Sequence, residues 1–150
     1  MARIVNIDAP STTRAVNAAL RTLGWTQDQL EFVRGNGYSY VVGYDAQFLA
    51  EERVGESMYD GGPMGSYTVA YWVDRVLELF ALAAHQHREH ARWLAALPVL
   101  AEEPDPSRPV YGPTFTLRVE GPRRPRFDPV PVLHRLEEAQ HAWRAWKRAV

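Results

Sequence analysis

The sequence of 150 residues contains no cysteine. This absence excludes a disulfide scaffold, a zinc site built on thiolates and a catalytic thiol. Long apolar runs are missing as well: no stretch approaches the roughly 18 apolar residues of a membrane-spanning helix, and the first residues lack the pattern of a signal peptide. We therefore expect a cytoplasmic protein without membrane association, in keeping with the reducing compartment that cysteine-free chains tolerate.

Lysine is scarce, and the charges that are present are unevenly distributed. One lysine stands beside 16 arginines, and the formal net charge is −1. Residues 1–106 carry 8 Arg against 14 Asp and Glu, whereas residues 107–150 carry 9 Arg and Lys against 4 Asp and Glu. A DNA mimic would be far more acidic over its whole surface, and a general nucleic-acid binder far more basic. We expect the acidic and the basic part to attract each other in the folded chain.

The sequence also lacks the common signatures of catalysis. It has no Gly-x-Ser-x-Gly, and neither of its glycine-rich stretches is followed by Gly-Lys-Ser or Gly-Lys-Thr. Such patterns place the nucleophile of a hydrolase or the phosphates of a nucleotide. Their absence predicts a protein that is not an enzyme and that holds no cofactor.

Histidines offer an alternative to this prediction. In the segment His85-Gln-His-Arg-Glu-His90, His87 and His90 fall on one side of a helix, where neutral imidazoles can bind a metal. A working site needs about three or four protein ligands, and no helical face supplies them here. We therefore predict no metal site, and a metal-dependent enzyme stays the less favoured alternative. A second set with helical spacing, which a solvated helix face explains, is His134, Glu138 and His141.

The strongest local signal that is present is a β-hairpin within Leu30–Tyr44. Two alternating apolar runs meet at Asn36-Gly37, the dipeptide typical of a tight primed turn with φ > 0 at both central residues. This turn would place Arg34 opposite Ser39, Val33 opposite Tyr40 and Phe32 opposite Val41. One face of the hairpin would carry Leu30, Phe32 and Val41, and the other Val33, Tyr38, Tyr40, Val42 and Tyr44.

Other periodicities complete the prediction of an α+β fold in a single domain over 1–150. Apolar residues recur with helical spacing before and after the hairpin, and proline is concentrated between 98 and 131, where nine of the eleven prolines lie. We expect a mainly antiparallel sheet of three or four strands, packed by a long central helix with Phe80 as a core anchor, and short N-terminal and C-terminal helices. Before and after the hairpin we expect a helix over 12–23, a short helix from Asp45 through Arg53, a loop over Gly55–Ser66 and a strand over Tyr67–Trp72. A helix over 74–97, capped by Asp74, should follow and bury Ala91 and Leu94. The chain should end with a proline-rich connection over 98–131, which contains an edge strand over Thr114–Glu120, and a helix over 131–149 with Trp143 and Trp146 on its apolar stripe.

The segment Ala18–Leu82 resembles a group of small proteins encoded on bacteriophages and other mobile elements. The matching residues are Gly35-Asn-Gly-Tyr-Ser-Tyr-Val-Val42 and Ser66-Tyr-Thr-Val-Ala-Tyr71, which correspond to a Gly-x-Gly-Tyr-x-Tyr hairpin and a Tyr-x-Val-x-Tyr strand. The match covers under half of the chain. The resemblance implies a genomic setting more than a chemistry, and with it a location in the cytoplasm of a bacterial host.

Tyrosine supplies the feature of greatest functional interest. Six of the seven tyrosines lie between 38 and 71. Tyr38, Tyr40, Tyr44, Tyr67 and Tyr71 could crowd one surface of the sheet. Aromatic cross-strand pairs stabilise a sheet, but tyrosine is also enriched at interaction hot spots and stacks on nucleic-acid bases.

Two functions follow as hypotheses. The first is a non-enzymatic interaction protein that binds, and could inhibit, a host or phage protein through this tyrosine-rich face. The second is an accessory protein that binds single-stranded nucleic acid by tyrosine stacking, with the basic residues Arg123, Arg124 and Arg126 placed to meet phosphates.

Overall fold

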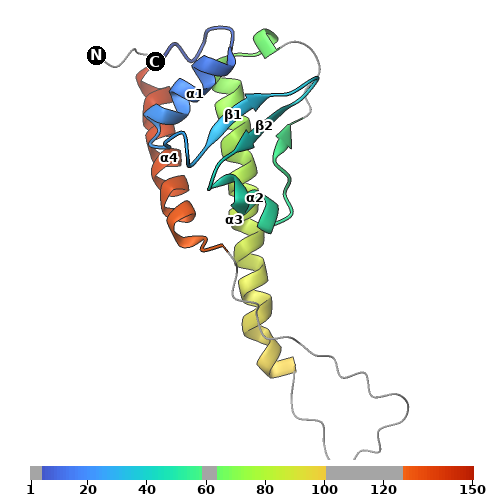
Figure 1. Ribbon diagram of the computed structural model, residues 1–150. Coiled ribbons are helices and arrows are strands. Elements are labelled where there is room, and N and C mark those ends of the chain that lie inside the picture. Colours follow the sequence, from blue (N-terminus) through green and yellow to red (C-terminus); the bar gives the residue numbers. More distant parts are fainter. Residues whose placement is uncertain (1–4, 59–63, 101–126) are drawn as a thin grey trace, which may run out of the picture.

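The computed structural model describes residues 5–58, 64–100 and 127–150, with the backbone alone for 97–100. It confirms an α+β fold, in which a three-stranded antiparallel sheet of order β1-β2-β3 packs beside helices (Figure 1). The elements in chain order are α1 (Thr13–Thr22), β1 (Glu31–Arg34), β2 (Ser39–Val42), α2 (Ala46–Glu51), β3 (Ser57–Met58), the 3-10 helix η1 (Met64–Ser66), α3 (Val69–Leu100) and α4 (Val130–Ala149).

The predicted hairpin is present with the expected register. Phe32 lies opposite Val41, and both side chains are fully buried against the helices. The predicted turn type is wrong, because Gly37 has φ of +80° whereas Asn36 does not have a positive φ. One positive φ at the third turn residue is the requirement of a type II turn, which glycine meets without strain.

Helix α1 closes the outer edge of β1. Its first turn is capped by Thr12, whose Oγ1 accepts a hydrogen bond from the Ala15 N–H at 3.1 Å. The Asn17 side chain then pairs with the strand backbone: its Oδ1 accepts from the Phe32 N–H at 2.7 Å, and its Nδ2 donates to the Phe32 carbonyl at 2.8 Å. Arg21 donates to the Leu30 carbonyl at 2.7 Å. These side chains occupy backbone groups that an edge strand otherwise presents to other chains.

The third strand is not where the sequence pattern placed it. The segment Tyr67–Trp72 leads into α3, and its alternation of apolar residues is part of a helical repeat in which Val69, Trp72, Val73 and Val76 are buried. The Thr68 hydroxyl accepts from the Tyr71 N–H at 3.2 Å, which helps to start the helix. The third strand is instead Ser57–Met58, inside the segment that was predicted to be a loop.

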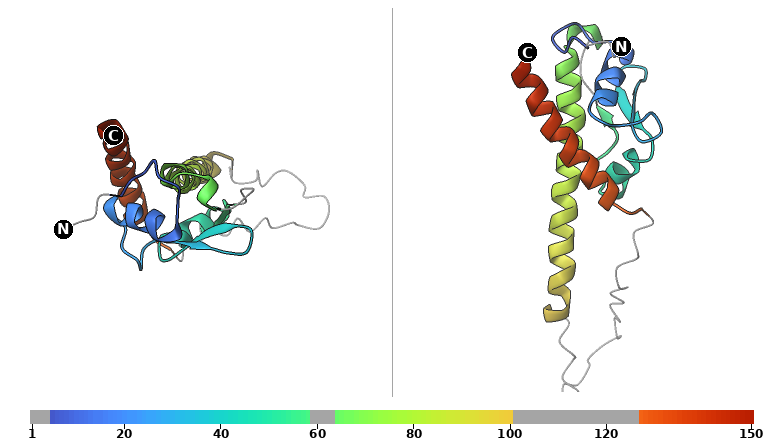
Figure 2. Two further views of the ribbon diagram at one scale, coloured as in Figure 1. Left: turned by 90° about the horizontal axis from the view of Figure 1, so that it is seen from above. Right: turned by 90° about the vertical axis from the view of Figure 1, so that its left-hand side faces the viewer.

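The helix α3 extends past the rest of the fold. We call the sheet, α1, α2, α4 and the part of α3 packed against them the body. Phe80 is fully buried, as predicted, and packs against Trp25 with ring centroids 5.8 Å apart. From residue 88 to 96 the side chains are exposed or half-buried, so Ala91 and Leu94 do not extend the core as predicted. Figure 1 and the right-hand view of Figure 2 show this half of α3 projecting past the sheet. The predicted start at Asp74 is also wrong, since that residue lies in the second turn of the helix.

The helix α4 packs along the body portion of α3 and crosses it, as the right-hand view of Figure 2 shows. Its buried residues are Val132, Leu136, Ala139 and Trp143, which confirms the predicted apolar stripe, while Trp146 is only half-buried. The predicted edge strand over 114–120 lies outside the described residues. None of the helices in the described ranges is long and apolar enough to cross a membrane.

Candidate interaction surface

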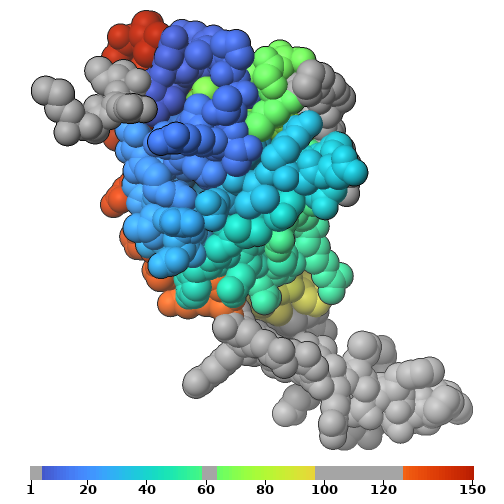
Figure 3. All heavy atoms as spheres, turned by 45° about the horizontal axis from the view of Figure 1, so that its top comes forward, coloured from blue at the N-terminus to red at the C-terminus, as the bar shows by residue number. Residues whose placement is uncertain are grey.

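The hairpin has one face that no described helix covers. Figure 3 shows its strands, in cyan, at the surface of the molecule. We call this the outward face. Val42 is 38% exposed, and the neighbouring tyrosines and Val33 are half-buried. By the register of the strands, the outward face consists of Glu31, Val33, Tyr38, Tyr40, Val42 and Ser57.

On this face, the ring of Tyr38 covers the backbone of a glycine. Tyr38 is paired with Gly35, whose N–H donates to the Tyr38 carbonyl at 2.8 Å. The Tyr38 ring lies against Gly35, because a Cβ at that position would come within 2.7 Å of the ring. An aromatic ring that covers a glycine in a paired strand shields the backbone there from water. The Gly-x-Gly-Tyr motif therefore combines a ring platform at Gly35 with the turn conformation at Gly37.

Tyr40 is the central aromatic residue of the outward face. It stands between Val33 on one neighbouring strand and Ser57 on the other. Its ring lies 5.7 Å from that of Tyr38, tilted by 33°. The exposed Val42 is the next residue on the same face of β2, and Glu31 on β1 lies opposite it and supplies a carboxylate.

The other three tyrosines do not join this surface as predicted. Gly43 has φ of +118°, which breaks the strand alternation, so Tyr44 packs against Phe127 with ring centroids 5.0 Å apart. Tyr67 and Tyr71 lie where α3 begins and stack on each other at 4.3 Å, with Trp72 in an edge-on contact with both rings. The tyrosines thus form separate clusters because residues 67–72 enter a helix and not a strand.

Other candidate residues do not converge on a site within the described ranges. Arg123, Arg124 and Arg126 lie outside those ranges. The Nδ1 atom of His87 lies 3.1 Å from Oε1 of Glu52, the residue that follows α2. The His90 ring stacks on Trp93 at 6.0 Å, and His85 is exposed.

The described part of the chain brings no three side chains of His, Asp or Glu together in a way that could hold a metal ion. His134, Glu138 and His141 all belong to one side of α4, together with Arg144. Because one helix supplies them all, they line open surface and do not enclose a substrate.

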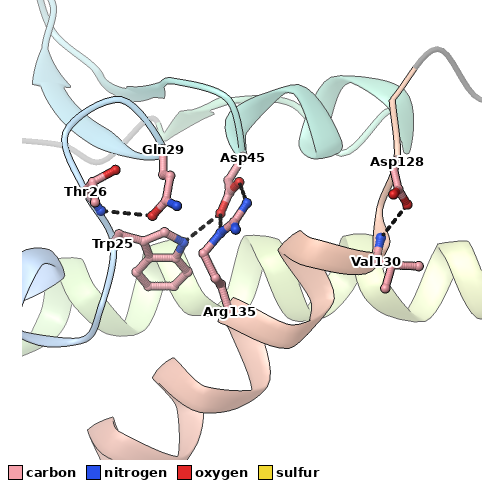
Figure 4. A network of polar contacts seen from close by, with 7 residues as sticks. All are labelled: Trp25, Thr26, Gln29, Asp45, Asp128, Val130 and Arg135. Carbon is pink, nitrogen blue, oxygen red and sulfur yellow. Dashed lines mark hydrogen bonds and ion pairs between the residues drawn. The ribbon is translucent and has the colours of Figure 1, made fainter.

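A buried polar network was not foreseen from the sequence. Asp45 was predicted to cap α2, but its side chain makes no capping hydrogen bond. The carboxylate is fully buried and accepts from Trp25 Nε1 at 2.9 Å and from Arg135 Nε and an Arg135 terminal nitrogen at 2.8 and 2.6 Å (Figure 4). The hydrogen bond to Asp45 raises the pKa of Arg135 above its ordinary value, against the opposing effect of burial. A bidentate pair of this kind fixes geometry as well as charge.

A second carboxylate binds α4 in the same manner. Asp74 on α3 accepts from Trp143 Nε1 at 2.7 Å and from Lys147 Nζ at 3.1 Å. Both carboxylates thus receive an indole N–H and a cation, and both cations belong to α4. The two contacts set the position of α4 along the body, so this helix lies away from the outward face.

These features define the class of the protein as an α+β fold with one uncovered, aromatic sheet face and a projecting helix. Comparison with known protein families, with curated proteins and with solved structures gave no match to the chain.

Proposed function

We propose that this protein is a non-enzymatic interaction protein, which binds a host or phage protein through the outward face of its hairpin and can inhibit that partner. The observation that carries the proposal is the placement of Tyr38 and Tyr40 beside the exposed Val42, on a sheet face that α1, α3 and α4 leave uncovered. Contiguous aromatic and aliphatic groups of this kind typically form the centre of protein interfaces. The mobile-element origin suggested by the hairpin motif belongs to the same proposal.

Charge favours a protein partner over a nucleic acid. Within the described residues, the outward face holds the carboxylate of Glu31 and no lysine or arginine. Arg34 falls on the opposite face, where it hydrogen-bonds to Ser39 at 3.3 Å. A surface that binds single strands needs cations along its stacking rings to meet the phosphates.

The proposal is tested with a variant that alters the outward face alone. In the double variant Tyr40→Ser/Val42→Ser, both changed side chains point away from the core; Tyr38 is kept because its ring covers Gly35. The protein captures its partner from a lysate of the source organism, and the partner is identified and purified. Calorimetry then measures both affinities, and we expect the double variant to bind about 30-fold more weakly, as for the loss of a hot spot.

The matched control is Glu138→Ser/His141→Ser, which changes two exposed side chains of α4. We expect this control to keep the full affinity. An unchanged affinity of the Tyr40→Ser/Val42→Ser variant, with its circular-dichroism spectrum and Tm preserved, contradicts the proposal. A salt-sensitive mobility shift of a single-stranded oligonucleotide, lost in the same variant, would instead support nucleic-acid binding.

A further inference from the structure

One side of α3, from Leu79 into the projecting half, carries a stripe with a regular repeat. Leu82 is 47% exposed and Trp93 is 55% exposed, although both are large apolar residues on the same helix. Between them the stripe is polar, with the exposed residues Gln86 and Glu89. The spacing alternates between three and four residues, which keeps one side of a helix facing a partner helix. In order, the stripe consists of the half-buried Leu79, which packs against the core, and of the exposed Leu82, Gln86, Glu89, Trp93 and Ala96.

This stripe is complementary to itself in one orientation. If two copies pair in parallel, each residue meets its own counterpart, so that Glu89 faces a second carboxylate and the two bulky Trp93 side chains meet. If they pair antiparallel about a point between His87 and Arg88, Leu82 meets Trp93, and Gln86 meets Glu89. The second arrangement places apolar side chains together and lets an amide donate to a carboxylate.

We propose that two copies of this chain associate through residues 79–96 of α3 as an antiparallel helix pair. At the edge of this pairing the half-buried Leu79 lies opposite the small Ala96. Leu82 and Trp93 are eleven positions apart, or about 16 Å along the helix, so the two apolar contacts lie at either end of a polar centre. Leu82 is exposed although it lies beside the body, so a second helix can reach its side chain.

The contact is short, and its dimer is therefore reversible. Two Leu82–Trp93 contacts and a polar centre bury less surface than the roughly 1,000 Å² that a stable interface needs. Glu89 also pairs with Arg92 on its own helix at 3.0 Å, but that ion pair is exposed and weak. The purified chain should accordingly pass from monomer to dimer as its concentration rises.

Sedimentation equilibrium tests association directly. We expect the average mass of the purified chain to rise toward that of a dimer between about 10 μM and 1 mM. Trp93→Ala should abolish this rise, whereas Val130→Ala, which changes a valine of α4 that is also 55% exposed, should leave it unchanged. A chain that stays monomeric up to about 1 mM overturns the proposal, whatever else binds the stripe.

Orientation is tested by cross-linking, which the absence of native cysteine makes unambiguous. Leu82→Cys and Trp93→Cys are prepared separately and mixed under mild oxidation. The antiparallel pair brings position 82 of one copy to position 93 of the other, so the mixture should form a mixed disulfide while each variant alone does not. A higher yield of the symmetric Leu82→Cys disulfide than of the mixed disulfide would indicate the parallel orientation and would overturn the proposal. Neither experiment involves the outward face of the hairpin, so the dimer can be disproved while the proposed function stands, and the reverse.

Discussion

Glycine is required at positions 43 and 37 for different structural reasons. Both have a positive φ, of +118° and +80°, but their surroundings differ. A Cβ on Gly43 would lie 2.7 Å from the Gln29 carbonyl oxygen, whereas a Cβ on Gly37 would meet nothing within 4 Å. Gly37 is therefore required by its turn alone, and Gly43 by its turn and by the close approach of a neighbouring backbone segment.

Alanine at the two glycines should separate these demands. We expect Gly37→Ala to lower the free energy of unfolding by about 1 kcal/mol, the cost of placing an L-residue at positive φ. Gly43→Ala should cost about 1–3 kcal/mol more, because the backbone of Gln29 cannot move aside as a side chain could. Urea unfolding of both variants measures the difference. Equal losses would show that the close approach at Gly43 relaxes without cost.

Asp45 and Arg135 form the ion pair on which the position of α4 depends. Asp45→Asn would leave the guanidinium of Arg135 without its counter-charge, and we expect a loss of about 3 kcal/mol in unfolding free energy. Glu78→Gln is the control, because Glu78 makes an exposed ion pair with Arg75 at 3.7 Å, and it should change stability by less than about 0.5 kcal/mol. A loss at Asp45 no larger than that of the control would contradict the assignment.

The same pair has a defined pH dependence on its basic side. The hydrogen bond to Asp45 raises the pKa of Arg135 in the folded chain above its ordinary value. A raised pKa stabilises the fold wherever the group is protonated in both states, and this contribution is lost only as the pH rises through the folded value. The difference in unfolding free energy between the native chain and Arg135→Met should therefore stay constant between about pH 7 and pH 10. A steady decline over that range would show that another group titrates with the pair.

At the scale of elements, the segment 67–72 shows why a local pattern can mislead. Tyr67, Val69 and Tyr71 alternate with smaller or buried residues, as in a strand, but Val69, Trp72 and Val76 also fit a helical repeat. A short apolar run fits both periods, and the longer pattern decides between them. Here the helical repeat continues through Phe80, so burial over several turns of α3 outweighs the local alternation.

The closure of β1 by α1 is an element-scale feature with a direct test. Asn17→Ala would remove the hydrogen bonds to both the N–H and the carbonyl of Phe32, and we expect it to cost about 2 kcal/mol. Asn17→Asp keeps the acceptor but loses the donor, so it should fall between the alanine variant and the native chain. Asn6→Ala is the control, since its side chain only accepts from the exposed Asp8 N–H. Thermal unfolding that ranks Asn17→Ala with Asn6→Ala would show that water replaces the side chain at no cost.

At the scale of the whole molecule, α3 joins two environments. Its first half packs against the sheet, α1 and α4, and its second half projects from them (Figure 2). Dimerisation through the projecting half would give an assembly with two outward faces, and a partner with two binding sites would then gain avidity. Binding through the outward face and dimerisation through α3 are argued from different residues, and a dimer would present two outward faces to one partner.

Amide hydrogen exchange should reveal the two halves of α3. At low micromolar concentration we expect amides 88–96 to exchange far faster than amides 72–84, because local opening of the projecting half exposes little buried apolar surface. Raising the concentration should slow exchange at 88–96 selectively as the dimer forms. Uniform protection along α3 at low concentration would contradict the division of the helix.

Local sequence determined the hairpin, its register and the start of α1, because these depend on neighbours in the chain. Asn36-Gly37 sets the turn, alternation selects the buried Phe32 and Val41, and Thr12 caps the helix. The apolar stripe of α4 was equally readable from its spacing. For the candidate surface, the sequence correctly identified Tyr38 and Tyr40 as members of one face.

Tertiary structure alone decided the partners of polar groups and the distribution of the other tyrosines. Asp45 and Arg135 are 90 positions apart, and no spacing rule connects a residue after a strand to one on the last helix. Likewise, Tyr67 and Tyr71 lie at the start of a helix and not in the sheet, because the burial of Trp72 and Phe80 in a long helix outweighs a short alternating pattern. Contacts between distant segments depend on how whole elements pack, and a local pattern contains no information about that packing.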